Sequence, residues 1–156
     1  MDLRIITVGK PSRDVHRVFV DEYVKRLRAV WSTEVISVAA ERLTQNTNGD
    51  EVMRREAERI ATKCPAEWPI VALDRCGAST GSAEFSQRMV DWQDSGIRGV
   101  TFVIGGALGL APEFVKSAAH RLSFGPMTLP HDLALVVLTE QLYRAMTIAQ
   151  GHPYHR

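Results

Sequence analysis

The chain has 156 residues, of which 45% are hydrophobic and 24% charged, and its formal net charge at pH 7 is +1. This length predicts a single domain, residues 1–156, with a substantial core, while the nearly neutral charge argues against broad electrostatic binding of nucleic acid. No apolar run approaches the roughly 18 residues of a membrane helix, and the first residues lack the order of a signal peptide. We therefore expect a cytoplasmic protein that does not associate with membranes.

Alternating apolar and turn-forming segments mark the elements of the first half of the chain. Apolar residues predict a strand over 3–8, and apolar side chains at helical spacing predict a helix over 15–30. A second strand is expected at 35–38, followed by a polar loop at 41–50 and a helix over 52–61.

The second half continues the same alternation. Short apolar runs bounded by turn signals predict buried strands at 69–74 and 100–104, with a helix over 85–92 between them. Further helices are expected to begin near Pro112 and near Asp132. Strands that alternate with helices predict an α/β fold in which a mostly parallel sheet carries helices on both faces.

Two cysteines, Cys64 and Cys76, match no spacing of metal ligands, and no nearby pair of histidines would complete a zinc site. In a reducing compartment we expect both to be free thiols. The sequence therefore predicts no metal.

The glycines Gly105, Gly106 and Gly109 follow a predicted strand and precede a predicted helix. Ligands of open α/β sheets bind at the carboxyl ends of strands, and glycine lets the backbone approach a ligand closely. The pattern alone leaves open whether these glycines line a ligand or only form a tight turn. It is neither a dinucleotide fingerprint nor a phosphate loop, which argues against NAD and ATP as ligands.

Groups that exchange protons gather at the end of the chain. Four of the five histidines, His120, His131, His152 and His155, fall in the last 37 residues, beside Tyr154. Because histidine changes its charge near neutral pH, this end of the chain is where the sequence predicts chemistry.

Four motifs together resemble the RlmH family, the ribosomal large-subunit methyltransferases H of the SPOUT class. They are IGGALG at 104–109, MTLPH at 127–131, EQLYRA at 140–145 and PYH at 153–155. The resemblance implies an S-adenosylmethionine-dependent enzyme that methylates N3 of a pseudouridine in helix 69 of 23S rRNA, within the ribosome. It also implies a SPOUT α/β-knot with a C-terminal trefoil knot, and a homodimer.

The resemblance further implies which residues contact the cofactor. In the family, the matching positions are those of Leu73, Gly105, Phe124, Gly125, Pro126, Met127, Thr128 and Leu129. From the residues alone, ordinary core packing would be the favoured role of Met127 and Leu129. A neutral adenosine needs an apolar slot and backbone contacts, with no cradle for phosphates.

The end of the chain supplies candidates for the methyl transfer itself. N3 of the base becomes reactive only when its proton leaves, which requires a base or a stabilising positive charge. Arg144 is the candidate for the positive charge, His155 for the proton acceptor, and Tyr154 for stacking on the flipped base. His131 and Arg156 are candidates for binding the substrate.

Simpler roles for two of these residues stay open. His131 would also serve as a cap of the last helix, and Arg144 would also form an i,i+4 ion pair with Glu140. The last helix has more apolar positions than one buried stripe requires, which favours packing against a second subunit.

Two departures from the family bear on the activity. Leu135 stands where relatives commonly carry an arginine, and Gly125 where they often carry a serine. The loss of a cation keeps open the alternative of a ribosome-associated module that binds S-adenosylmethionine without turnover. A SPOUT methyltransferase that acts on tRNA also stays open, because the identity of the target base is not readable from the sequence.

Overall fold

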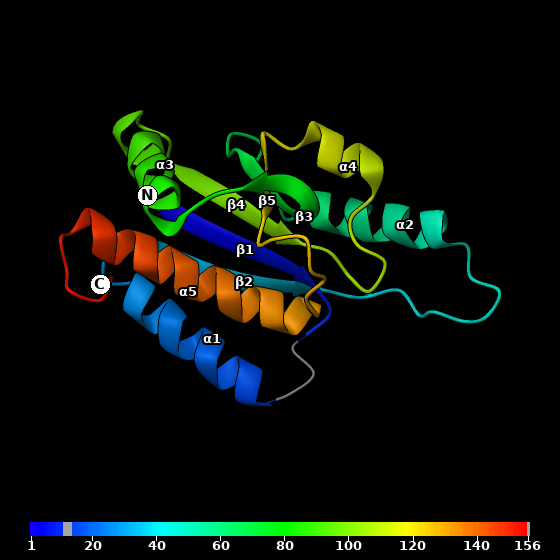
Figure 1. Ribbon diagram of the computed structural model, residues 1–156. Helices are drawn as coiled ribbons and strands as arrows, with labels where there is room; N and C mark the ends of the chain where they lie inside the picture. The colour runs from blue at the N-terminus through cyan, green and yellow to red at the C-terminus, as the bar shows by residue number, and fades with distance from the viewer. Residues whose placement is uncertain (11–13, 156) are drawn as a thin grey trace.

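Strands and helices alternate along the chain in the computed structural model, which describes residues 1–10 and 14–155 (Figure 1). The order is β1 (Asp2–Val8), α1 (Asp14–Leu27), β2 (Ser32–Val38), α2 (Gly49–Ala61), β3 (Ile70–Ser79), α3 (Ser82–Asp94), β4 (Gly99–Ile104), α4 (Pro112–Ser117), β5 (His120–Ser123) and α5 (His131–Ala149). The strands form one sheet in the order β2-β1-β4-β3-β5, and every pair of neighbours is parallel. The predicted α/β fold with a parallel sheet is confirmed.

Helices cover both faces of this sheet, because side chains of a strand alternate between its faces. Leu3 and Ile5 of β1 belong to the larger core, which α1, α3 and α5 close. Ile6 and Val8 belong to a smaller core on the other face, against α2 and α4. Figure 1 shows α1 and α5 running side by side on one face of the sheet.

The last helix, α5, lies at the centre of the larger core. It packs against both α1 and α3, so much of its apolar surplus is buried within its own chain. Leu135 is 1% exposed and belongs to this core. The residue that replaces the family's arginine therefore contributes packing, whereas Leu133, 38% exposed, stays at the surface.

Strand β3 is longer than the predicted strand at 69–74. It continues to Ser79 through a register shift between Leu73 and Ala78, and a Cβ atom at Gly77 would stand 2.8 Å from the backbone of Arg121. Only glycine allows this approach, which lets the end of β3 pair with β5.

Strand β5 was not predicted, because its four residues, HRLS, include only one large apolar side chain, Leu122. In the part of the chain that the structure describes, it pairs only with β3 and lies at the edge of the sheet. The trefoil knot that the family resemblance implies stays a prediction. Within residues 1–10 and 14–155, no helix combines the length and the hydropathy that crossing a bilayer requires.

The burial of α5 predicts a large effect of a single truncation. Leu138 is fully buried, so we expect Leu138→Ala to lower the free energy of unfolding in urea by about 2–5 kcal/mol through lost contacts and the cavity it leaves. Leu43→Ala is the control, since Leu43 is 47% exposed and surface truncations change stability by about 0.5 kcal/mol or less. Equal stabilities of the two variants would contradict the packing of α5.

Candidate functional site

A cavity of about 820 Å³ lies at the carboxyl ends of β4 and β5, beside the middle of β3. Most of its lining comes from three segments: the middle of β3, the loop that follows β4, and the loop between β5 and α5. The predicted residues that line it are Leu73, Gly105, Phe124, Gly125, Met127, Thr128, Leu129 and His131. Pro126 belongs to the same loop but does not line the cavity. Seven of the eight predicted cofactor positions thus share one cavity.

The glycine loop after β4 is a tight turn that also lines the cavity. The Gly109 amide donates to the Gly106 carbonyl over 3.0 Å, and Gly109 has a φ of +85°, which favours glycine. A Cβ atom at Gly105 would lie 2.6 Å from the Gly109 carbonyl carbon. The two interpretations of the glycine pattern, a tight turn and a ligand-lining loop, are therefore compatible. The turn needs glycines, and it forms one wall of the cavity.

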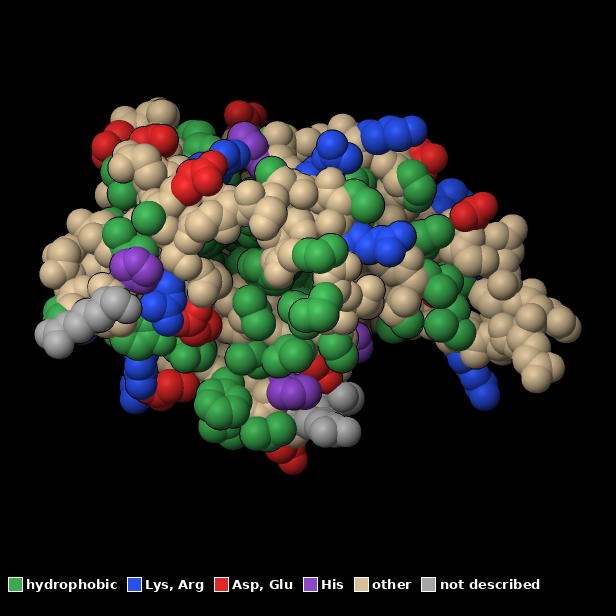
Figure 2. Space-filling view, viewed as in Figure 1, with side chains coloured by type: hydrophobic (Ala, Val, Ile, Leu, Met, Phe, Trp, Pro, Cys, Tyr) green, Lys and Arg blue, Asp and Glu red, His purple; other side chains and the backbone are tan. Residues whose placement is uncertain are grey.

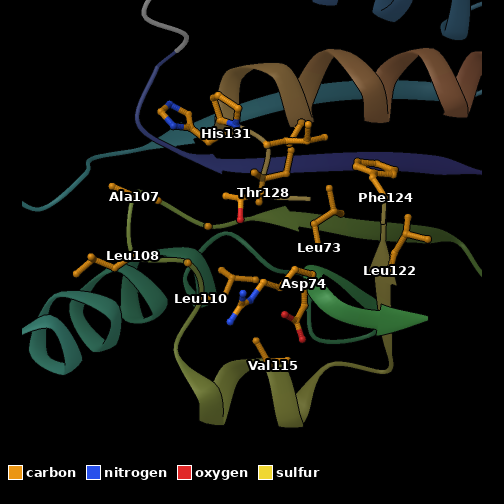
Figure 3. A pocket seen from close by; sticks show the side chains of 18 of the residues that line it. Leu73, Asp74, Ala107, Leu108, Leu110, Val115, Leu122, Phe124, Thr128 and His131 are labelled. Carbon is orange, nitrogen blue, oxygen red and sulfur yellow. The ribbon is translucent and has the colours of Figure 1, made fainter. Parts of the chain in front are cut away.

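The side walls of the cavity are largely apolar. Figure 3 shows Leu73 and Thr128 projecting toward the same space, with Phe124 at one end and Leu108 at the other. Met127 is 81% exposed, so the core-packing alternative is wrong for this residue. An apolar slot edged by backbone groups is typical of sites for a planar ring such as adenine.

The sequence analysis did not single out two charged residues of the cavity, Asp74 and Arg75. Both directly follow the buried part of β3, which was the available signal. The Asp74 carboxylate accepts a hydrogen bond from the Cys76 amide over 3.2 Å. Asp74 places a negative charge beside a cavity expected to hold a sulfonium cation.

His131 lies at the cavity and is the first residue of α5. The cap position is Pro130, which makes no side-chain capping bond, so the capping alternative is wrong for His131. Its Nε2 atom lies 2.8 Å from Oδ1 of the buried Asp132. The other carboxylate oxygen of Asp132 lies 3.5 Å from Nδ1 of His16, on α1. This carboxylate connects α1 to the rim of the cavity, a link that no sequence pattern indicated.

The predicted catalytic residues Arg144, Tyr154 and His155 gather around Glu140, in the middle of α5. Arg144 Nε donates to Glu140 Oε1 over 3.0 Å, and the Tyr154 hydroxyl donates to the same oxygen over 3.1 Å. His155 Nδ1 lies 3.4 Å from Arg144 Nη1. Arg144 therefore makes the predicted pair with Glu140 and also holds the end of the chain. Arg156 lies outside the described residues.

Tyr154 is held by aromatic neighbours as well. Its ring meets Tyr143 edge to face, with centroids 4.8 Å apart, and the Arg144 guanidinium lies 4.8 Å from its centroid. Its hydroxyl lies 3.5 Å from that of Tyr23. Burial, followed by the bonds to Tyr23 and Glu140, raises the pKa of Tyr154 well above its ordinary value. The phenol therefore keeps its proton at neutral pH.

The cavity and the Glu140 cluster are separated within one chain. Ala134 lines the cavity, and Arg144 lies ten residues further along α5, about 15 Å at the rise of an α-helix. Figure 1 shows the chain end at the opposite end of α5 from the β5–α5 loop. One chain alone does not bring His131 and Arg144 together.

No group of three metal-ligating side chains occurs among residues 1–10 and 14–155. Cys64 and Cys76 are free thiols, and burial raises the pKa of Cys64.

Comparisons with a family model and with curated sequences both identify methyltransferases as relatives of this chain. The family described as "Predicted SPOUT methyltransferase" matches residues 1–155. Proteins called ribosomal RNA large subunit methyltransferase H are 40% identical in Gemmatimonas aurantiaca, with both chains covered completely, and 47% identical in Rubrobacter xylanophilus, with 86% of each covered.

Solved structures support the fold. A probable methyltransferase from Bordetella pertussis has a TM-score of 0.57 at 16% identity, covering 92% of this chain and 95% of its own. A probable methylase family protein from Haemophilus influenzae has the same TM-score at 12% identity, covering 99% of this chain and 70% of its own.

The glycine turn predicts a sharp effect on ligand binding. Since a Cβ atom at Gly105 meets backbone rather than a flexible side chain, we expect Gly105→Ala to weaken the binding of S-adenosylhomocysteine about tenfold or more in calorimetry. Gly81→Ala is the matched control, because its φ of −76° suits any residue, its Cβ would meet no atom within 4 Å, and it does not line the cavity. Equal affinities of the two variants would exclude this loop from the ligand site.

The environment of Tyr154 predicts an effect of pH. A raised pKa means that the neutral phenol stabilises the fold; this contribution is complete below the ordinary pKa of about 10 and is lost as the pH rises through the raised value. We expect ultraviolet titration of the folded protein to show a tyrosine that ionises late, and Tyr154→Phe to remove that phase. In concentrated guanidinium the phase should return to the ordinary range; a late phase that survives Tyr154→Phe would contradict the assignment.

Proposed function

Because the chain belongs to the SPOUT methyltransferases, and among them to the ribosomal RNA large subunit methyltransferase H family, we propose that it methylates N3 of a pseudouridine in helix 69 of 23S rRNA on the assembled ribosome. The protein is an S-adenosylmethionine-dependent rRNA methyltransferase. The observation that carries the proposal for the site is that seven of the eight residues predicted to contact the cofactor line one cavity.

The cavity fits S-adenosylmethionine by its chemistry. Leu73, Phe124 and Leu129 would enclose the adenine, while the backbone around Gly105 approaches the ligand without side chains. Asp74 would favour the positive charge of the ligand. When bound, S-adenosylmethionine supplies a methyl group on a sulfonium that a nucleophile can attack.

The protein's own residues would prepare that nucleophile. The Arg144 guanidinium is a permanent cation, since its pairing with Glu140 raises its already high pKa, and it would stabilise the deprotonated imide ring. Tyr154, which keeps its proton, would stack on the base or donate a hydrogen bond to it. His155, exposed at the end of the chain, would take the N3 proton.

A homodimer would bring the cavity of one subunit and the Glu140 cluster of the other together. Val15, Val18 and Phe19 of α1 are 53%, 66% and 50% exposed, and Leu133 of α5 is also exposed. Figure 2 shows hydrophobic side chains at the surface on this side of the molecule. We propose that a second copy packs on this face of α1 and α5, so that the Glu140 cluster of one subunit serves the cavity of the other.

The dimer would also offer rRNA more positively charged side chains on one surface than a single, nearly neutral chain does. Figure 2 shows basic side chains interspersed with acidic ones on this face, without a continuous basic field. Two copies side by side would join their separate cations into one surface for the rRNA backbone, where charge dominates affinity.

The alternative of a module without turnover depended on Leu135. Leu135 lies in the core and does not line the cavity, so in this chain it contributes packing and not a contact with the ligand. No observation favours tRNA as the substrate.

The decisive experiment is the transfer of a tritiated methyl group to whole ribosomes, separated subunits and tRNA, all from cells that lack the enzyme. We expect label in 23S rRNA of assembled ribosomes, at N3 of a pseudouridine. Label in tRNA would replace the proposed substrate, and cofactor binding without any label would favour the module.

The two-subunit site predicts complementation between inactive variants. We expect Arg144→Ala to lower kcat about a hundredfold or more, since it removes the fixed charge, and Arg144→Lys to restore only part of it. Mixing Arg144→Ala subunits with Gly105→Ala subunits should recover activity, because the hybrid dimer retains one intact pair of halves. Sedimentation should give twice the 17.4 kDa of one chain; a monomer, or no recovery on mixing, would refute the shared site.

A further inference from the structure

A second cavity, of about 300 Å³, adjoins the first. It lies between the start of α3 and the middle of α5, and it shares Leu122 and Phe124 with the cofactor cavity. Its other walls include Phe85, Val137, Ser82 and Gln141. At the lower end of the usual range of ligand pockets, about 300–1,000 Å³, it suits a single small ring.

Two polar side chains of this cavity, Ser82 and Gln141, have a fixed hydrogen-bond direction. Glu140 is paired with Arg144, and its carboxylate only accepts hydrogen bonds. The side-chain atom of Gln141 that lies 2.7 Å from Glu140 Oε2 must therefore be the amide nitrogen. The Gln141 carbonyl oxygen then faces Ser82, and the Ser82 hydroxyl must donate to it over 2.7 Å.

Because of this hydrogen-bond direction, the side-chain oxygens of Ser82 and Gln141 can accept further hydrogen bonds at the cavity wall. The Ser82 hydroxyl has given its only hydrogen to Gln141, so its oxygen offers two lone pairs, and the Gln141 carbonyl oxygen keeps one more. The rings of Phe85 and Phe124 provide apolar surface beside them. The cavity is thus suited to a flat ring that carries an N–H group.

We propose that this second cavity receives the target base and that Ser82, oriented through Gln141 and Glu140, accepts the hydrogen bond of its N1–H group. Pseudouridine has this group because a carbon joins it to the ribose, whereas the N1 of uridine carries the ribose instead. The inference rests on the proposed function and adds the basis of its selectivity. A site built to bond an N–H rejects the analogue that lacks it, since its acceptors are then left unpaired.

Ser82 is at the same time separate from the cofactor cavity, whose lining does not include it. Substitution of Ser82 should therefore change which base is methylated without changing cofactor affinity. This separation allows selectivity to be tested apart from cofactor binding.

The test compares two kinds of ribosome from cells that lack this enzyme: one with the target pseudouridine, and one from cells that also lack the synthase that forms it, so that uridine remains. For wild type, Ser82→Ala and Ser82→Thr, kcat/KM is measured on both. We expect wild type to prefer pseudouridine, Ser82→Ala to lower the ratio of the two kcat/KM values about tenfold, and Ser82→Thr, which keeps the hydroxyl, to retain it. Calorimetry with S-adenosylhomocysteine should show equal affinity in all three.

An unchanged ratio in Ser82→Ala would overturn the inference, even if both activities fell together. So would a wild type that methylates uridine equally well, or a Ser82→Thr variant with the low ratio of Ser82→Ala. Wild type that labels neither ribosome would instead refute the proposed function, and with it this inference.

Discussion

The site depends on the parallel pairing of the strands. Because β3, β4 and β5 run in one direction, their carboxyl ends meet at one edge of the sheet, and the loops that follow them meet there too. The glycine turn after β4 and the loop before α5 then need only to be short and closely packed to enclose a cavity. A sheet of mixed direction would send these loops to opposite edges and leave no cavity.

Much of this arrangement is readable in the sequence. The apolar runs of β1 and β4 predict buried strands, and the glycines after β4 predict the turn, because each depends on local chemistry. Residues 120–123 carry no such signal, since β5 exists only by pairing with β3 through the close approach at Gly77. The contact of Asp132 with His16 likewise joins segments more than a hundred residues apart, which no local pattern encodes.

The Glu140 carboxylate organises the other end of the protein. It accepts bonds from Arg144, Tyr154 and Gln141 together, so one acidic side chain sets the positions of the end of the chain and the polarity of the second cavity. The sequence shows Glu140 only as one half of an i,i+4 pair. Its wider role depends on the return of the chain end along α5 and on Ser82 from α3.

Helix α5 fixes the distance between these two ends of the protein. It begins at the cavity and carries Gln141 and Arg144 at set distances along one rigid rod. Inserting or deleting a single residue between Ala134 and Glu140 would turn everything beyond it by about 100° and shift it by about 1.5 Å. Such a change would turn Gln141 away from Ser82 of α3, which would not move with it, even though every side chain would be retained. The length of this helix, as much as its composition, is therefore a functional constraint on the chain.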